Sequence, residues 1–153
     1  MRHAKSDWSA SYGSDHDRPL NDRGVKSAGA MGETLTAEHL APDLVVTSTA
    51  IRARSTAELA AAAGGWDCDI RLDARLYGSG ADVAIQVASE SLAAERLMLV
   101  GHQPIWSILV SVLSGERVDM KTATVAVLEF DEWPVLETPL GRLVGVYQPR
   151  DYL

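Results

Sequence analysis

Two short apolar runs, each followed closely by a helical stretch, limit most strongly what this chain can fold into. Residues 44–48 read Leu-Val-Val-Thr-Ser and residues 96–100 read Arg-Leu-Met-Leu-Val, which suits buried strands of a parallel sheet. An alanine-rich stretch at residues 51–63 and a proline-opened stretch at residues 104–113 both end near glycine, as helices do. Repeated strand-then-helix units predict a three-layer α/β/α fold, with a mostly parallel central sheet and helices on both faces.

The rest of the chain adds weaker elements to this frame. Residues 9–18 are polar and rich in Ser, Gly and Asp, which predicts a loop. Asn21 or Asp22 can cap a helix that runs to about His39, because its apolar residues recur at helical spacing. Further along the sequence predicts a weak strand at residues 70–72, a helix at 82–92, and a late edge hairpin of strands 122–130 and 143–147.

Size and charge narrow the functional classes. With 153 residues and 46% hydrophobic content, residues 1–153 are expected to form one domain. A formal charge of −7 argues against a nucleic-acid partner, because binding a polyanion depends on clustered Lys and Arg. No segment has the apolar length of a membrane span, so no membrane partner is expected. The single cysteine, Cys68, cannot form an internal disulfide, which favours a reducing, cytoplasmic location.

Arginine and histidine side chains stand where a ligand site would be in such a fold. Arg52 follows the first apolar run by a few residues, His102 follows the second, and Arg2 stands beside His3. Open parallel sheets bind ligands beyond the carboxyl ends of their strands. Arginine offers two parallel donors to a phosphate, and histidine can attack through one ring nitrogen while the other is held. These four side chains could therefore converge on one anion.

Four motifs spread over roughly residues 1–130 resemble those of the histidine phosphatase superfamily, also called phosphoglycerate-mutase-like. The resemblance is greatest to its SixA-type phosphohistidine phosphatase branch, although Ala4 stands where the family has glycine. The motifs are, in order, Arg2-His3-Ala4, Arg18-Pro19-Leu20-Asn21-Asp22-Arg23-Gly24, Ser48-Thr49-Ala50-Ile51-Arg52-Ala53-Arg54-Ser55-Thr56-Ala57-Glu58 and Val100-Gly101-His102-Gln103-Pro104.

The resemblance implies a phosphohistidine or phosphomonoester phosphatase in which His3 becomes phosphorylated, with no cofactor and no metal. It implies that Arg2, Arg52 and His102 hold the phosphoryl oxygens, and that His102 also helps as a proton donor. The implied partner is a phosphorylated protein that carries phosphohistidine, or a small phosphomonoester.

Two further phosphate contacts and one structural gap also follow from the resemblance. Arg18 would be an additional phosphate or substrate contact, and Ser9 falls where mutase-like relatives carry an asparagine phosphate contact. Relatives place an apolar strand before the first motif, whereas only Met1 precedes Arg2 here. The first strand is therefore expected to be missing or truncated, with His3 on a frayed end.

Three other functions compete with the phosphatase. A non-catalytic phosphate-binding or signalling interaction module of the same fold would keep the pocket without turnover. A mutase would need an acidic residue from an inserted segment, for which residues 75–95 leave little room. A metallohydrolase would need a cluster of His and Asp at ligand spacing, and arginines in the pocket would repel a cation.

The remaining titratable residues have lesser expected roles. Arg54, His16 and His39 are expected at the surface. No residue aligns with the acid that mutase-like relatives use to protonate a leaving alkoxide. The available substitutes are Asp7, Asp15, Asp17 and Tyr77.

Overall fold

The centre of the protein is a parallel sheet of three strands. The structure, a computed structural model, describes residues 1–91, 93–132 and 141–153. The strands are β1 (Leu44–Thr47), β2 (Asp69–Leu72) and β3 (Leu97–Val100), and β1 lies between the other two. Leu44 pairs with Asp69 on one side and with Leu97 on the other. All three carboxyl ends therefore lie at the same edge of the sheet.

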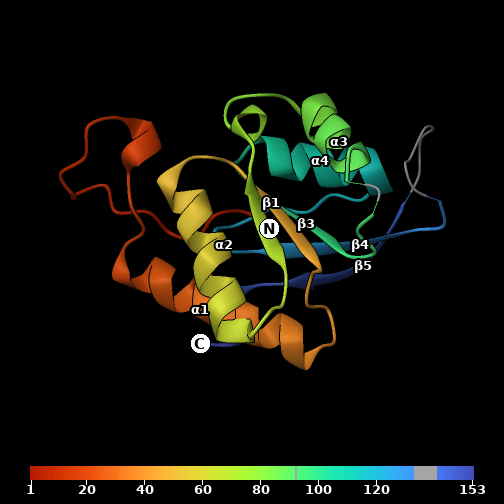
Figure 1. The fold of residues 1–153 in the computed structure, drawn as a ribbon, viewed down its shortest axis with the longest axis horizontal. Coiled ribbons are helices and arrows are strands. Elements are labelled where there is room, and N and C mark those ends of the chain that lie inside the picture. Colours follow the sequence, from red (N-terminus) through yellow and green to blue (C-terminus); the bar gives the residue numbers. More distant parts are fainter. Residues whose placement is uncertain (92, 133–140) are drawn as a thin grey trace.

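Two pairs of helices cover the two faces of this sheet. Helices α1 (Asp22–Ala37) and α2 (Ile51–Gly64) lie on one face, and α3 (Ala81–Ser89) and α4 (Ile105–Ser114) lie on the other (Figure 1). The predicted three-layer α/β/α fold is confirmed, but α3 ends at Ser89, before its predicted end at residue 92, which itself lies outside the described residues. None of the helices in the described ranges is long and apolar enough to cross a membrane.

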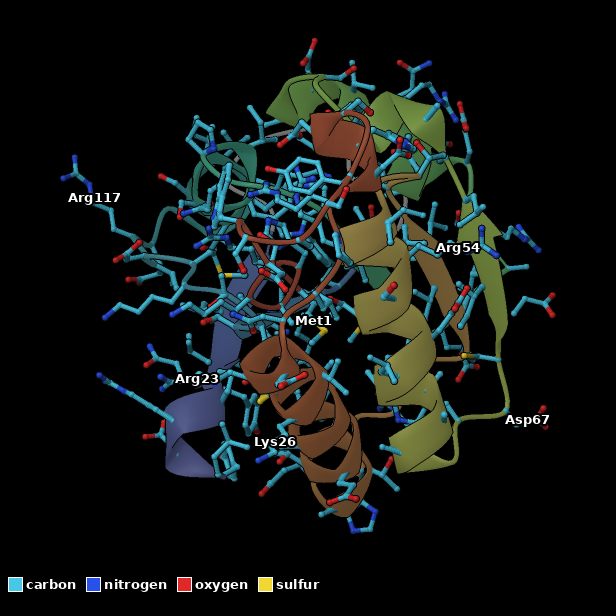
Figure 2. The ribbon with its side chains drawn as sticks, turned by 90° about the vertical axis from the view of Figure 1, so that its left-hand side faces the viewer. Met1, Arg23, Lys26, Arg54, Asp67 and Arg117 are labelled. Carbon is cyan, nitrogen blue, oxygen red and sulfur yellow. The ribbon has the colours of Figure 1, made fainter. Side chains whose placement is uncertain are left out.

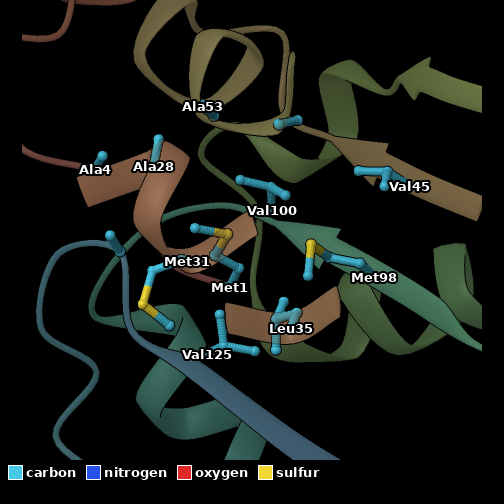
Figure 3. Packing of buried hydrophobic residues seen from close by; sticks show 12 residues of the cluster. Met1, Ala4, Ala28, Met31, Leu35, Val45, Ala53, Met98, Val100 and Val125 are labelled. Carbon is cyan, nitrogen blue, oxygen red and sulfur yellow. The ribbon is translucent and has the colours of Figure 1, made fainter. Parts of the chain in front are cut away.

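Alternation along β1 divides the core between the two faces. Val45 packs with Met31 and Leu35 of α1, and Figure 3 shows these side chains gathered beneath the sheet. Leu44 and Val46 point to the opposite face, where they join a cluster with side chains of α4. Because successive residues of a strand face opposite ways, one strand of four residues contributes apolar side chains to both layers.

Helices α1 and α2 approach each other closely at a glycine. A Cβ atom on Gly32 would collide with the backbone of Ala60, so only glycine fits at this crossing. The start of α1 is fixed by Asn21, whose side chain accepts a hydrogen bond of 2.8 Å from the Gly24 amide. The predicted cap at Asn21 is therefore present.

Residues 1–3 join the parallel sheet to an antiparallel hairpin of β4 (Val125–Phe130) and β5 (Gly141–Tyr147). The amide of His3 donates to the Gly101 carbonyl at 3.0 Å, and the amide of Arg2 donates to the Thr124 carbonyl at 3.0 Å. Residue 2 makes an isolated parallel bridge to Gly101, and no strand is assigned over residues 1–3. The expected frayed end is wrong, because His3 is 7% exposed and is bonded on both sides.

Candidate functional site

The predicted basic and imidazole residues meet at the carboxyl edge of the sheet. His102 follows β3 directly, Arg52 lies in the first turn of α2 after β1, and His3 comes from the seam of residues 1–3. The ring centroids of His3 and His102 lie 5.2 Å apart. Segments separated by about a hundred residues thus share one site, because each follows or flanks the end of a neighbouring strand.

The geometry of His3 fixes which of its ring nitrogens is free. Its Nδ1 lies 2.7 Å from the carbonyl oxygen of Ala4, and since a carbonyl only accepts, Nδ1 must carry the proton. The Ala4 amide in turn donates to the Thr56 hydroxyl at 2.9 Å, which holds this backbone in place. The Nε2 atom is therefore left with its lone pair, as a nucleophile requires.

Burial keeps both histidine rings neutral. Desolvation lowers the pKa of His3 to about 3, against a raising contribution from the Ala4 carbonyl and with further lowering by His102, Arg52 and Arg2. Desolvation, followed by the charge of Arg52, lowers the pKa of His102 to about 4. At neutral pH both rings are uncharged, so the lone pair of the His3 Nε2 atom is available for attack.

His102 is held through one nitrogen and faces the site with its ring. Its Nε2 lies 2.8 Å from the Ser48 hydroxyl, at the end of β1. Its Nδ1 is buried and has no hydrogen-bond partner among the residues that the structure describes. The Tyr77 ring stands edge-on to His102, with the two centroids 5.5 Å apart. Tyr77 thus forms part of the wall beside the two histidines.

Three arginines supply positive charge around these rings. Arg52 is 6% exposed, and its Nη1 and Nη2 donate to the backbone oxygen and the carboxylate of Asp15 at 2.7 and 3.0 Å. Arg18 is 4% exposed, and its guanidinium lies 3.4 Å from the centroid of the Trp8 ring. The Arg2 Nη1 donates to the Met120 carbonyl at 3.1 Å.

The three arginines hold more buried donors than the surrounding protein satisfies. The Nε atoms of Arg2, Arg18 and Arg52, together with Nη1 of Arg18, are buried without a hydrogen-bond partner in the described part of the chain. Buried donors are normally paired, so these unpaired donors leave positive charge in the site that the protein does not offset with hydrogen bonds. The arrangement suits a tetrahedral anion beside two neutral imidazoles.

Three residues of the site were assigned lesser roles from the sequence. Asp15 contacts Arg52 and Arg18, and its Oδ2 also accepts a 2.8 Å hydrogen bond from the Tyr77 hydroxyl. His16 was expected at the surface, but it lies 2.8 Å from the Thr49 hydroxyl and edge-on to Tyr77. A carboxylate three residues before a motif arginine was the available signal for Asp15. For Tyr77 the sequence offered none.

The other candidate residues make their contacts outside this cluster. Ser9 is exposed, and its hydroxyl donates to Asp7 at 2.7 Å, so its role as a phosphate contact stays a prediction. Arg54 pairs with Glu58 at 2.8 Å on the outer side of α2, as expected for a surface residue (Figure 2). In the described ranges no group of three or more His, Cys, Asp or Glu side chains is placed to hold a metal ion.

Comparisons with known proteins cover nearly the whole chain. The profile of the histidine phosphatase superfamily (branch 1) matches residues 1–79. An uncharacterized protein of Mycobacterium tuberculosis is 37% identical over 163 residues, which are 98% of this chain and 100% of the relative. A Nakamurella multipartitia structure assigned as phosphohistidine phosphatase SixA is 31% identical with a TM-score of 0.85, over 97% of this chain and 93% of that one. A structure from Agrobacterium tumefaciens with the same assignment is 26% identical with a TM-score of 0.84. The match covers 97% of this chain and 95% of that one.

Proposed function

Because this chain belongs to the histidine phosphatase superfamily, we propose that it is a SixA-type phosphohistidine phosphatase that works through a phospho-His3 intermediate. The family and the SixA-like fold support phosphatase activity in general. The observation that carries the finer proposal is His3 itself, a buried neutral ring whose Nδ1 is tied to a carbonyl and whose Nε2 is open. The guanidinium groups of Arg2, Arg18 and Arg52, whose charges act on the two histidine rings, would bind the phosphoryl oxygens.

In the first step the Nε2 lone pair of His3 attacks phosphorus. The distal ring nitrogen of the substrate phosphohistidine takes a proton from water or through His102, and the bonding pair of the P–N bond goes to the leaving nitrogen. The substrate histidine departs as a neutral ring, and the phosphoryl group stays on His3. The arginines stabilise the charge that spreads over the equatorial oxygens during transfer.

In the second step a water molecule attacks the phosphorus of phospho-His3. The P–N bond breaks, its electron pair returns to Nε2, and the water proton passes to solvent, which replaces the proton taken up earlier. Orthophosphate leaves, and His3 is again neutral. No cofactor or metal takes part in either step. A cytoplasmic location and a phosphorylated protein as partner belong to the same proposal.

Trapping of the phosphoenzyme tests this function. The protein is incubated with a protein that carries ³²P-phosphohistidine and is quenched in alkaline detergent, because P–N bonds survive alkali and break in acid. We expect an acid-labile label on the wild type and on the surface variant Arg54→Ala, and none on His3→Asn. Label on His3→Asn would contradict the proposal. Orthophosphate binding without any label would instead favour a non-catalytic phosphate-binding module.

A further inference from the structure

The Asp15 carboxylate binds Arg52 and Arg18, which the proposed function takes to be phosphate ligands. Its Oδ2 accepts from Nη2 of Arg52 at 3.0 Å and from the Tyr77 hydroxyl at 2.8 Å, and its Oδ1 lies 3.1 Å from Nη2 of Arg18. The backbone oxygen of the same residue takes Nη1 of Arg52 at 2.7 Å. Both terminal nitrogens of Arg52 are therefore committed to residue 15 when no ligand is bound.

A carboxylate and a phosphate make the same demand on a guanidinium. Both accept two parallel hydrogen bonds from its planar fork, so one arginine cannot serve both fully at the same time. We propose that Asp15 is an internal carboxylate ligand that competes with phosphate for Arg52 and Arg18 and so limits how tightly the site holds its product. The inference rests on the proposed function, because it takes these arginines to be the phosphate ligands.

Exposure shows which partner of these ion pairs can leave. The Asp15 side chain is 51% exposed, whereas those of Arg18 and Arg52 are 5% and 7% exposed. Asp15 belongs to a short 3₁₀ turn, Asp15–Asp17, and the chain before it runs out from the body of the molecule as a loop (Figure 1). The arginines are fixed by packing, while the carboxylate can turn into water. An arriving anion would therefore displace Asp15 and leave the arginines in place.

The contact also has a use while the site is empty. Two guanidinium groups buried side by side repel each other, and burial without a counter-charge carries a large desolvation cost. One carboxylate that touches both offsets that cost and holds the two groups where a phosphate would need them. Asp15 is in this sense a positioning residue, since it acts through Arg52 and Arg18 and not on the reacting atoms.

Calorimetric titration of the full chain with orthophosphate tests the competition. Asp15→Asn keeps the size of the side chain and an acceptor for the Tyr77 hydroxyl, but it removes the negative charge. We expect Asp15→Asn to bind orthophosphate about tenfold more tightly than the wild type, a factor that corresponds to about 1.4 kcal/mol. The matched control is Asp17→Asn, which removes the same charge from the same turn at a carboxylate that contacts Ser14 and His16. It should change the Kd less than about twofold.

Kinetics give a second readout that a merely structural role would not move. With Asp15→Asn, the inhibition constant of orthophosphate and the KM should both fall by similar factors, because both ligands gain the same arginines. If Asp15→Asn does not fold, Tyr77→Phe carries the test. It removes one hydrogen bond that holds Asp15 in place, and it should tighten orthophosphate binding by a smaller factor.

The outcomes separate this inference from the proposed function. If the wild type binds orthophosphate and Asp15→Asn binds it equally or more weakly, the carboxylate is a strut for the arginines and the competition is overturned. If neither protein binds orthophosphate, there is no phosphate site, and the proposed function falls together with the inference. Phosphoenzyme on the wild type with no change in the Asp15→Asn constants would overturn the inference alone.

Discussion

In the proposed mechanism His3 attacks only while its ring is uncharged, and burial keeps both His3 and His102 uncharged. Desolvation is the largest cause of the lowered pKa in both rings, ahead of the charges of the surrounding arginines. A histidine in water would be partly protonated near pH 6.5 and would lose its lone pair. The buried floor of the site therefore allows attack on a phosphoryl group even in mildly acidic solution.

The pH dependence of the free energy of unfolding should reflect the same burial of the two histidines. Because the folded-state pKa values are about 3 and 4, against 6.5 for an unfolded ring, the unfolded chain binds more protons between pH 6.5 and about 4. The free energy of unfolding should then have its full value above pH 6.5. It should fall as the pH drops through this window, by up to about 1.4 kcal/mol per pH unit for each ring. Urea denaturation at a series of pH values measures this.

The variant His3→Asn isolates one of the two rings. Its free energy of unfolding should fall less steeply between pH 6.5 and 4.5 than that of the wild type, because one depressed histidine is gone. Carboxylates with lowered pKa values, such as Asp15 and Asp73, lose their contribution at lower pH and do not mask this difference. Identical slopes would mean that His3 is not neutral through burial.

Arg52 and Arg54 lie two residues apart on α2 and make a matched pair. Arg52→Lys should lower kcat/KM by about 10²-fold or more, because an ammonium is a point charge where a fork with two parallel donors is needed. Arg54→Lys should have almost no effect, since Arg54 is half exposed and pairs with Glu58. Steady-state rates on a phosphohistidine peptide measure both. Equal losses at the two positions would mean that the phosphate contact has been assigned to the wrong arginine.

Residues that follow a strand could be placed from the sequence, and residues held by distant contacts could not. Arg52 and His102 were predictable because an apolar run ends just before each of them. Asp15 reaches Arg52 from a position 37 residues away, out of a loop without periodicity. Tyr77 is placed by its hydrogen bond to Asp15, 62 residues away. Such contacts depend on the fold as a whole, and a local sequence pattern carries no information about them.

Among the elements, the crossing of α1 and α2 depends on the absence of a side chain. Gly32→Ala should destabilise the protein by about 1–3 kcal/mol, because its Cβ would meet the backbone of Ala60 and the helices would have to move apart. The matched control is Gly29→Ala in the same helix, where a Cβ would only touch the side chain of Ala63 at 3.7 Å. It should be neutral or stabilising by up to about 1 kcal/mol. Thermal unfolding of both variants decides the matter.

The elements with strong periodicity or clear end signals were all predicted. The helix from Asp22 and the buried strands are where the sequence indicated, whereas the first hairpin strand begins at Val125 and not at residue 122. The short 3₁₀ turns could not be predicted, since three residues carry no period. The register shift in the hairpin between Val127 and Leu128 has no signal in the sequence that we can identify.

At the scale of the whole molecule, the connection between β2 and α3 borders the site, because Tyr77 lies in it beside His102. Residues 73–80 hold a short 3₁₀ turn, Ala74–Leu76, and no longer inserted segment. The acid that they bring to the site is the Tyr77 hydroxyl, a weak one, because its hydrogen bond to Asp15 raises its pKa. Without a positioned acid, an alkoxide is a poor leaving group, and such an acid is typically worth about 10² to 10⁴ in rate. An imidazole leaves more easily, because it departs as a neutral ring.

The order of substrates follows from this difference. We expect kcat/KM to be highest for a phosphohistidine peptide, lower for an aryl phosphate, and lowest for a phosphoserine peptide, with about 10²-fold or more between first and last. All three are measured with one protein preparation. If phosphoserine were turned over as fast as phosphohistidine, a general acid would have to be present, and the SixA-type assignment would give way to a general phosphomonoesterase.

Because residues 1–3 bond to both sides, exchange at His3 reports how firmly the two sheets are held together. Its amide bonds to Gly101 on the parallel side, its carbonyl accepts from the Ala123 amide on the hairpin side, and Arg2 bonds to Thr124. The His3 amide hydrogen is freed for exchange when residue 3 separates from Gly101, and the Ala123 amide hydrogen when residue 123 separates from His3. Comparing the two exchange rates would show which side of His3 opens more readily, and either opening would release the backbone that positions its ring.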